Sequence, residues 1–236
     1  MIRIALAVLI ALPLLTGCES SQREGRRLAR TVADNYGYDG WDAIDQIEFT
    51  FNAEVGNKTV RRVWRWYPQA HHAVANPVST ESVSFSTVSP TEDHAEVHQQ
   101  FINDSYWLVF PFRMIQNHDV EFEATGPAPL PLGDGRAAER LVVTWPEAGG
   151  YSPGDVYELF VRQDGLIREW IYRRHGSDEP TRISTWEDHR RVGPIVLSLD
   201  HHGPADSNFR VWFSDVRVRM RGRAIHLSPL PIGPVH

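Results

Sequence analysis

Apolar residues in this sequence recur mainly at every second position, which favours β-strands over helices. The segment IEFTF places one isoleucine and two phenylalanines on one face, with a glutamate and a threonine on the other. After the turn VGNK, the segment TVRRVWRW alternates in the same way, although Arg62 interrupts its apolar face. The clearest pair is VYELFV and LIREWIY, which flank Asp164-Gly165 and predict a β-hairpin with a type I′ turn.

One central segment departs from this period and predicts a helix over about residues 90–108. Ser89 and Pro90 suit the start of a helix, and Pro111 makes Phe110 a natural end. A short amphipathic helix is predicted over 26–36, before the first strand. Strands, one substantial helix and further hairpin-connected strands indicate a mainly β (α+β) fold with an antiparallel sheet.

The chain begins like a secreted protein. Arg3 is followed by an apolar run over residues 4–15, which is too short to cross a bilayer. The length suits the hydrophobic region of a signal peptide, and we predict that residues 1–17 are such a peptide. The alternative is a buried helix of the mature domain.

Cys18 is the one cysteine in the sequence, and it closes the segment LTGC. This segment resembles the lipobox of bacterial lipoproteins, in which the cysteine is acylated and becomes the first residue. The resemblance implies a membrane anchor at Cys18, followed by a polar tether over 18–27. Glu19, in place of an aspartate, favours the periplasmic face of the outer membrane.

Composition excludes several function classes. A formal net charge of −6 argues against nucleic acid as a partner. There is no G-x-S-x-G motif, phosphate-binding loop or cysteine nucleophile, so we expect no enzyme, no catalytic residues and no cofactor. His94 and His98 share a helical face, but without an evident third ligand we expect no metal site. One domain is expected over 28–226, with a C-terminal tail over 227–236.

Three segments resemble a family of bacterial envelope lipoproteins whose fold is like that of the LolA/LolB lipoprotein carriers. They are YDGWDAIDQIEFTF, FINDSYWLVFPFRM and GDVYELFVRQDGLIREWIY, with NDSYWLVFPF the most specific part. The resemblance implies a strongly curved antiparallel sheet, an incomplete barrel, with helices packed in its concave face. In the carriers that face is apolar and holds acyl chains.

Aromatic residues are the candidate ligand-binding positions, because together they would line an apolar hollow. The alternative is that the same side chains form a packed core. Trp170 is expected to face outward, since Arg168 and Tyr172 are its neighbours in the two-residue period. The candidate residues are Phe49, Phe51, Trp64, Trp66, Phe101, Tyr106, Trp107, Trp145 and Trp212.

The leading hypothesis is therefore a lipid-anchored, non-enzymatic protein of the cell envelope that binds an acyl chain or another apolar ligand. A second hypothesis is a structural or protein-interaction lipoprotein with a filled core, and a third is an enzyme on the same scaffold. The sequence indicates the membrane as one partner and does not identify a protein partner. A continuous void of several hundred Å³ would favour the first hypothesis over the second.

Overall fold

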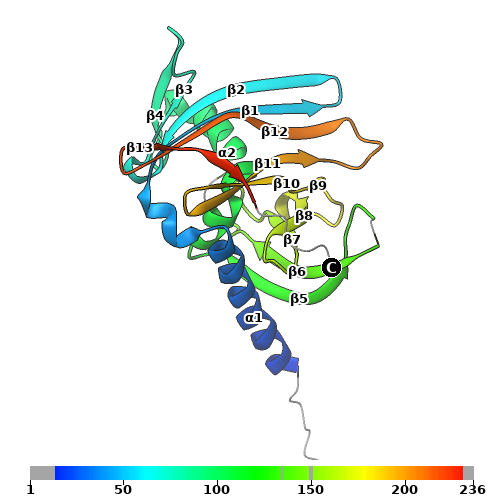
Figure 1. The fold of residues 1–236 in the computed structure, drawn as a ribbon. Helices are drawn as coiled ribbons and strands as arrows, with labels where there is room; N and C mark the ends of the chain where they lie inside the picture. Colours follow the sequence, from blue (N-terminus) through cyan, green and yellow to red (C-terminus); the bar gives the residue numbers. More distant parts are fainter. Residues whose placement is uncertain (1–13, 134, 149–150, 231–236) are drawn as a thin grey trace, which may run out of the picture.

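The computed structural model describes residues 14–133, 135–148 and 151–230, whose strands form two antiparallel sheets (Figure 1). Sheet A, with nine strands, contains β1 Ile44–Val55, β2 Lys58–Tyr67, β3 His72–Ala75, β4 Val83–Ser86, β10 Glu187–Val192, β11 Ile195–His202, β12 Phe209–Met220, β13 Arg223–Ile225 and β14 Leu227–Pro229. Sheet B, with five strands, contains β5 Glu121–Pro129, β6 Ala137–Thr144, β7 Val156–Val161, β8 Ile167–Arg173 and β9 Arg182–Thr185. The helices are α1 Leu14–Asn35 and α2 Ala95–Gln116, with short 3₁₀ segments at η1 Tyr38–Ala43, η2 Pro68–Ala70, η3 Glu92–His94 and η4 Arg174–Gly176.

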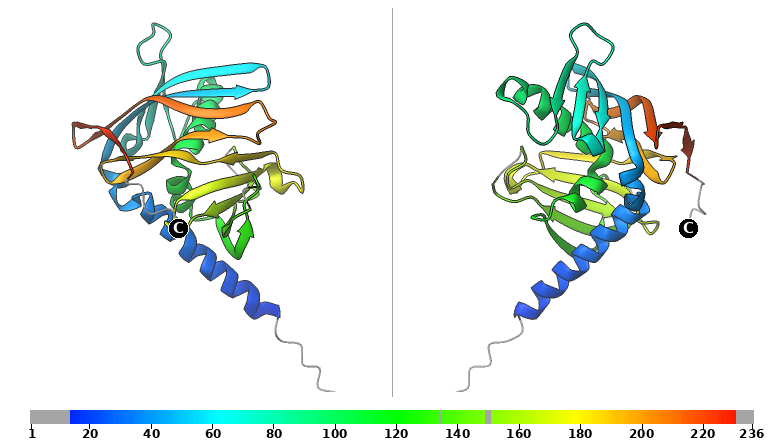
Figure 2. Two further views of the ribbon diagram at one scale, coloured as in Figure 1. Left: turned by 45° about the vertical axis from the view of Figure 1, so that its right-hand side comes forward. Right: turned by 90° about the vertical axis from the view of Figure 1, so that its left-hand side faces the viewer.

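The two sheets meet where the chain passes from β9 to β10. Trp186, the single residue between these strands, donates its backbone N–H to the carbonyl of Arg168 in sheet B. On the other side, the backbone N–H of His202 in sheet A donates to the hydroxyl of Thr185. The sheets curve around α2 without closing, as Figures 1 and 2 show. The predicted fold class, an incomplete antiparallel barrel with a helix in its concavity, is confirmed.

Helix α1 is longer than the sequence pattern predicted. The expected tether over 18–27 is helical, and Cys18 lies within α1. Residues 1–13, most of the predicted signal peptide, lie outside the described residues. The polar residues of this stretch are compatible with a helix, and packing against the domain extends the helix beyond its amphipathic part.

The packing of α1 on β5 explains a glycine in the middle of this helix. A Cβ atom on Gly25 would lie 2.6 Å from the backbone of Phe122 and Glu123, so only glycine permits this approach. Farther along α1, Val32 and Tyr36 are fully buried. The Tyr36 hydroxyl and His189 Nε2 are 2.8 Å apart and hydrogen-bonded. Helix α1 therefore covers the edge strand of sheet B.

Helix α2 begins later and ends later than the prediction of residues 90–108. Pro111 does not end the helix but lies inside it, next to a kink at Val109, where φ is −129°. A proline removes one helical hydrogen bond and crowds the preceding turn, which a kink accommodates. The helix continues to Gln116 because its buried side chains, including Phe112 and Met114, pack into the core.

Two hairpin predictions are confirmed, and two details are corrected. β1 pairs with β2 and β7 with β8. Of Asp164 and Gly165, only the glycine has a positive φ (77°), so the turn is not type I′. The predicted tail over 227–236 begins with β14, which pairs with β10, so the domain extends at least to Pro229. Among the described residues, no helix combines the length and hydropathy needed to cross a bilayer.

Candidate ligand-binding site

The space between α2 and sheet A is filled with aromatic side chains. The ring centroids of Trp64 and Phe101 are 5.4 Å apart, and those of Trp66 and Phe101 are also 5.4 Å apart. Phe85 of β4 closes the cluster at 5.9 Å from Phe101. All four rings are at most 3% exposed, and their edge-to-face contacts are the preferred geometry of a packed core.

Arg62, which interrupts the apolar face of β2, forms a buried ion pair with α2. Its Nε donates to Asp104 Oδ2 over 2.7 Å, and Trp64 Nε1 donates to the same oxygen over 2.8 Å. The guanidinium also lies 5.0 Å from the ring centroid of Phe51. Burial raises the pKa of Asp104, an effect that the hydrogen bonds from Arg62 oppose. This pair fixes the register of α2 on sheet A.

A second aromatic cluster joins α2 to sheet B. Trp170 packs against Trp107 with ring centroids 4.7 Å apart, against Phe110 at 5.3 Å and against Trp186 at 5.2 Å. Trp170 is 2% exposed and faces inward, so the expectation that it faces outward was wrong. Because β8 carries apolar residues on both faces, its alternation did not distinguish the inner face from the outer.

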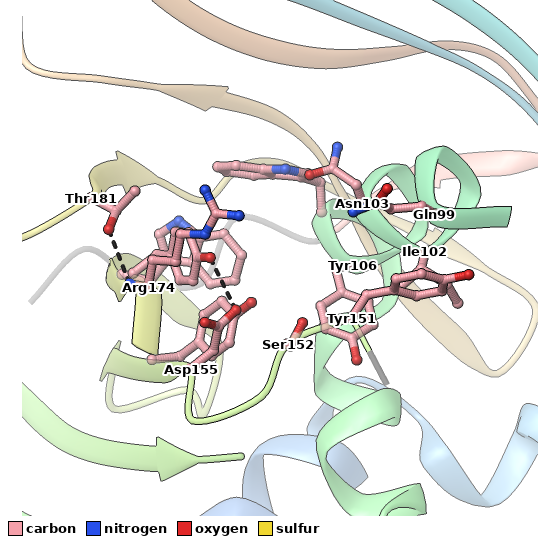
Figure 3. Close-up of a pocket in the computed structure, with 13 residues that line it drawn as sticks. Gln99, Ile102, Asn103, Tyr106, Tyr151, Ser152, Asp155, Arg174 and Thr181 are labelled. Carbon is pink, nitrogen blue, oxygen red and sulfur yellow. Dashed lines mark hydrogen bonds between the residues drawn. The ribbon is translucent and has the colours of Figure 1, made fainter. Parts of the chain in front are cut away.

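Beside this cluster lies a cavity of about 310 Å³ between α2, the inner face of sheet B and the segment 151–155 (Figure 3). The α2 residues that line it share one helical face. Aromatic rings from α2, β7 and β8 form most of its apolar surface. The lining residues are Gln99, Ile102, Asn103, Tyr106, Trp107, Tyr151, Ser152, Asp155, Tyr157, Trp170, Tyr172, Arg174 and Thr181.

Polar groups gather at one end of the cavity. Asp155 is buried and accepts two hydrogen bonds, from the Tyr172 hydroxyl over 3.0 Å and from the His175 backbone N–H over 2.9 Å. Burial and the nearby Asp155 carboxylate raise the pKa of Tyr172. The backbone N–H of Arg174 donates to the Thr181 hydroxyl over 3.0 Å, and its side chain extends towards α2 (Figure 3). The cavity is therefore amphipathic.

The structure separates the candidate aromatic residues into three groups. Tyr106 and Trp107 line the cavity. Trp212 lies on the outer face of β12, under the guanidinium of Arg210 at 4.8 Å, while Phe213 faces the interior. The remaining candidates are buried in core packing: Phe49, Phe51, Trp64, Trp66, Phe101 and Trp145.

Several cavity residues were missed by the sequence prediction. Tyr157 and Tyr172 lie in the predicted β7–β8 hairpin, and the alternation of Tyr157 with Leu159 was an available signal. Asp155 and Arg174 lie outside regular strands, where no periodicity marks them. Residues from loops and 3₁₀ segments reach the cavity only through the tertiary fold.

The two helix histidines do not converge on a common site. His98 Nε2 lies 3.1 Å from the carbonyl oxygen of Thr87 and its Nδ1 lies 3.1 Å from the Tyr151 hydroxyl. His94 Nδ1 lies 3.2 Å from the Thr91 hydroxyl. Within the described part of the chain, no group of three or more His, Cys, Asp or Glu residues is placed to hold a metal ion.

No protein-family model matches the sequence, and no curated protein matches it. Three solved structures are similar. A DUF1329 family protein from Desulfovibrio piger has a TM-score of 0.49 at 14% identity, over 85% of this chain and 93% of its own. A LolA superfamily protein from Nitrosomonas europaea has a TM-score of 0.48 at 8% identity, over 83% and 93%. A domain described as an outer membrane lipoprotein-sorting protein, from Vibrio parahaemolyticus, has a TM-score of 0.48 at 8% identity, over 84% and 93%. The LolA-like fold that the sequence resemblance implied is thus found among its structural neighbours.

Proposed function

We propose that this protein holds the apolar part of a lipid-like ligand in the cavity between α2 and sheet B. The observation that carries the proposal is a cavity of about 310 Å³, lined by aromatic rings on the inner face of the sheet. Ligand pockets of about 300–1,000 Å³ are typical of small-molecule sites. Each methylene removed from water there would contribute about 0.8 kcal/mol to binding.

The proposal includes acylation of Cys18 and a location at the periplasmic face of the outer membrane. The leader and the segment LTGC support the anchor. More than one lipid chain is needed for stable anchoring, and a lipoprotein cysteine carries several. Because Cys18 lies in α1, which packs on β5, the anchor would join the domain through a helix rather than a flexible tether. Such a protein would receive or hold a lipid near the membrane.

Native mass spectrometry of the protein starting at Glu19, purified without detergent and exposed to bacterial lipid extract, tests the ligand. We expect bound lipid in the wild type and much less in Ile102→Trp, which places a larger side chain in the cavity. Val55→Trp is the matched control, since it adds the same ring at a residue that is 39% exposed on β1. Absence of lipid from a folded wild type, or equal loading of both variants, would contradict the proposal.

One observation favours the second hypothesis, a structural or protein-interaction lipoprotein without a ligand. The half of the concavity next to sheet A is filled by the protein's own rings. If the whole interior acts only as a core, the wild type would bind no lipid in the experiment above. Cross-linking in the intact envelope would then recover a protein partner equally with the wild type and with Ile102→Trp.

A further inference from the structure

The cavity contains a cationic side chain without an anionic partner. Arg174 lines the cavity, and its guanidinium extends from the Thr181 side towards α2 (Figure 3). Among the described residues, no carboxylate oxygen lies within 4.0 Å of its guanidinium nitrogens. The neighbouring Arg173, in contrast, is paired with Glu158. Arg174 is therefore free to bind a group that the protein itself does not supply.

The acidic side chain nearest to this end of the cavity is already engaged. Both oxygens of Asp155 accept hydrogen bonds, and the residue is 3% exposed, so it offers little surface to a ligand. Arg174, by contrast, is exposed to the cavity and to solvent. On the α2 side, Gln99 and Asn103 add amide groups that can donate hydrogen bonds. The accessible polar surface therefore favours an acceptor with negative charge.

We infer that the ligand is an anionic amphiphile whose carboxylate or phosphate head binds Arg174 while its apolar tail lies against the aromatic rings. This inference rests on the proposed function and specifies the ligand of the same cavity. Arginine suits this task because its planar guanidinium forms paired hydrogen bonds with carboxylates and phosphates. The tail would contact Tyr106, Trp107 and Tyr157, which line the same cavity.

The test measures displacement of a neutral fluorescent probe, the methyl ester of cis-parinaric acid, from the full-length acylated protein and its variants at pH 8. The competitors share a palmitoyl chain: palmitate carries a carboxylate, lysophosphatidate a phosphate, and monopalmitoylglycerol no charge. We expect the anionic competitors to displace the probe at about five- to tenfold lower concentration than the neutral one. The stronger of the two anions identifies which head the site prefers.

Three variants locate this preference. Arg174→Gln is expected to reduce the anionic-to-neutral ratio to about one, while Arg174→Lys retains part of it because the charge remains. Arg219→Gln, on an exposed residue of β12 that does not line the cavity, is the control and keeps the full ratio. An unchanged ratio in Arg174→Gln would overturn the inference.

The outcomes separate this inference from the proposed function. If the wild type binds the probe but all three competitors are equal, the anionic head is wrong and the apolar site stands. Stronger displacement by hexadecylamine than by palmitate would assign the head-group role to Asp155 instead of Arg174. If the folded protein binds neither the probe nor any competitor, the proposed function itself fails.

Discussion

The two halves of the concave interior use similar aromatic side chains with different results. Next to sheet A, Trp64, Trp66 and Phe101 are packed edge to face and are at most 2% exposed. Next to sheet B, Trp107 and Trp170 pack as closely, with ring centroids 4.7 Å apart, yet an open cavity remains beside them. Aromatic content alone therefore does not determine whether a curved sheet is filled.

The difference lies in what α2 presents to each half. Towards sheet A it presents Phe101 and Asp104, whose ring and carboxylate meet Trp64 and Arg62 of β2. Towards the cavity it presents shorter or polar side chains, among them Ile102. Two consecutive residues, Phe101 and Ile102, thus face different environments, which makes α2 a convenient place to test the comparison.

The largest expected effect is that of Phe101→Ala in the filled half. The ring is fully buried against Trp64, Trp66 and Phe85, so its removal leaves a void that the packed neighbours cannot close. We expect a loss of about 3–5 kcal/mol in the free energy of unfolding. Chemical denaturation measures it, and a loss below about 1 kcal/mol would show that this half is not a packed core.

The next effect is that of Asp104→Asn, which leaves the Arg62 guanidinium without its counter-charge. Removing one partner of a buried pair costs about 3–5 kcal/mol, and we expect the lower end because the Arg62 side chain is 26% exposed. Asp188→Asn, in a surface pair with Arg190, is the control and should change the stability by less than about 0.5 kcal/mol. Equal effects of the two substitutions would remove the argument that Arg62 and Asp104 fix α2.

Acid is expected to weaken the wall shared by both halves. His201 is fully buried between Trp107, Trp186 and Phe213, and burial lowers its pKa to about 3. An unfolded histidine titrates near pH 6.5, so the stability contributed by neutral His201 is present above that pH and is lost as the pH falls towards 3. The loss approaches about 1.4 kcal/mol per pH unit below about pH 6.

His189 adds to the same dependence, because burial lowers its pKa to about 4 while it is hydrogen-bonded to Tyr36. Urea denaturation at pH 7, 6 and 5 measures the slope, in a range where most carboxylates stay ionised. His201→Gln should reduce the slope, whereas His175→Gln, at an exposed residue, should leave it unchanged. A slope that is the same in all three proteins would contradict the assignment.

The sequence predicted the strands well because alternation is a local property. The β1–β2 and β7–β8 hairpins and the position of α2 could all be inferred from neighbouring residues. Which face of a strand is inner is not a local property, and Trp170 and Trp212 were therefore assigned to the wrong faces.

The cavity was harder to predict than the fold for the same reason. Of the residues proposed to bind a ligand, Tyr106 and Trp107 line it, and both lie on the predicted helix. Asp155 and Arg174 come from a loop and a 3₁₀ segment that the fold of sheet B brings next to α2. No sequence period marks such positions, because their proximity depends on long-range pairing between strands.

The smallest expected change in stability is that of Ile102→Ala, next to Phe101 on α2. Its side chain is half-buried and borders the open cavity, so truncation widens a space that solvent can enter instead of creating an enclosed void. We expect a loss of about 1 kcal/mol or less in the free energy of unfolding, together with weaker binding of the parinarate ester, since the tail loses apolar contact. Denaturation and probe titration on the same preparation measure both quantities. If Ile102→Ala were as destabilising as Phe101→Ala, the two halves would be one continuous core, and the cavity could not hold a ligand without unfolding its surroundings.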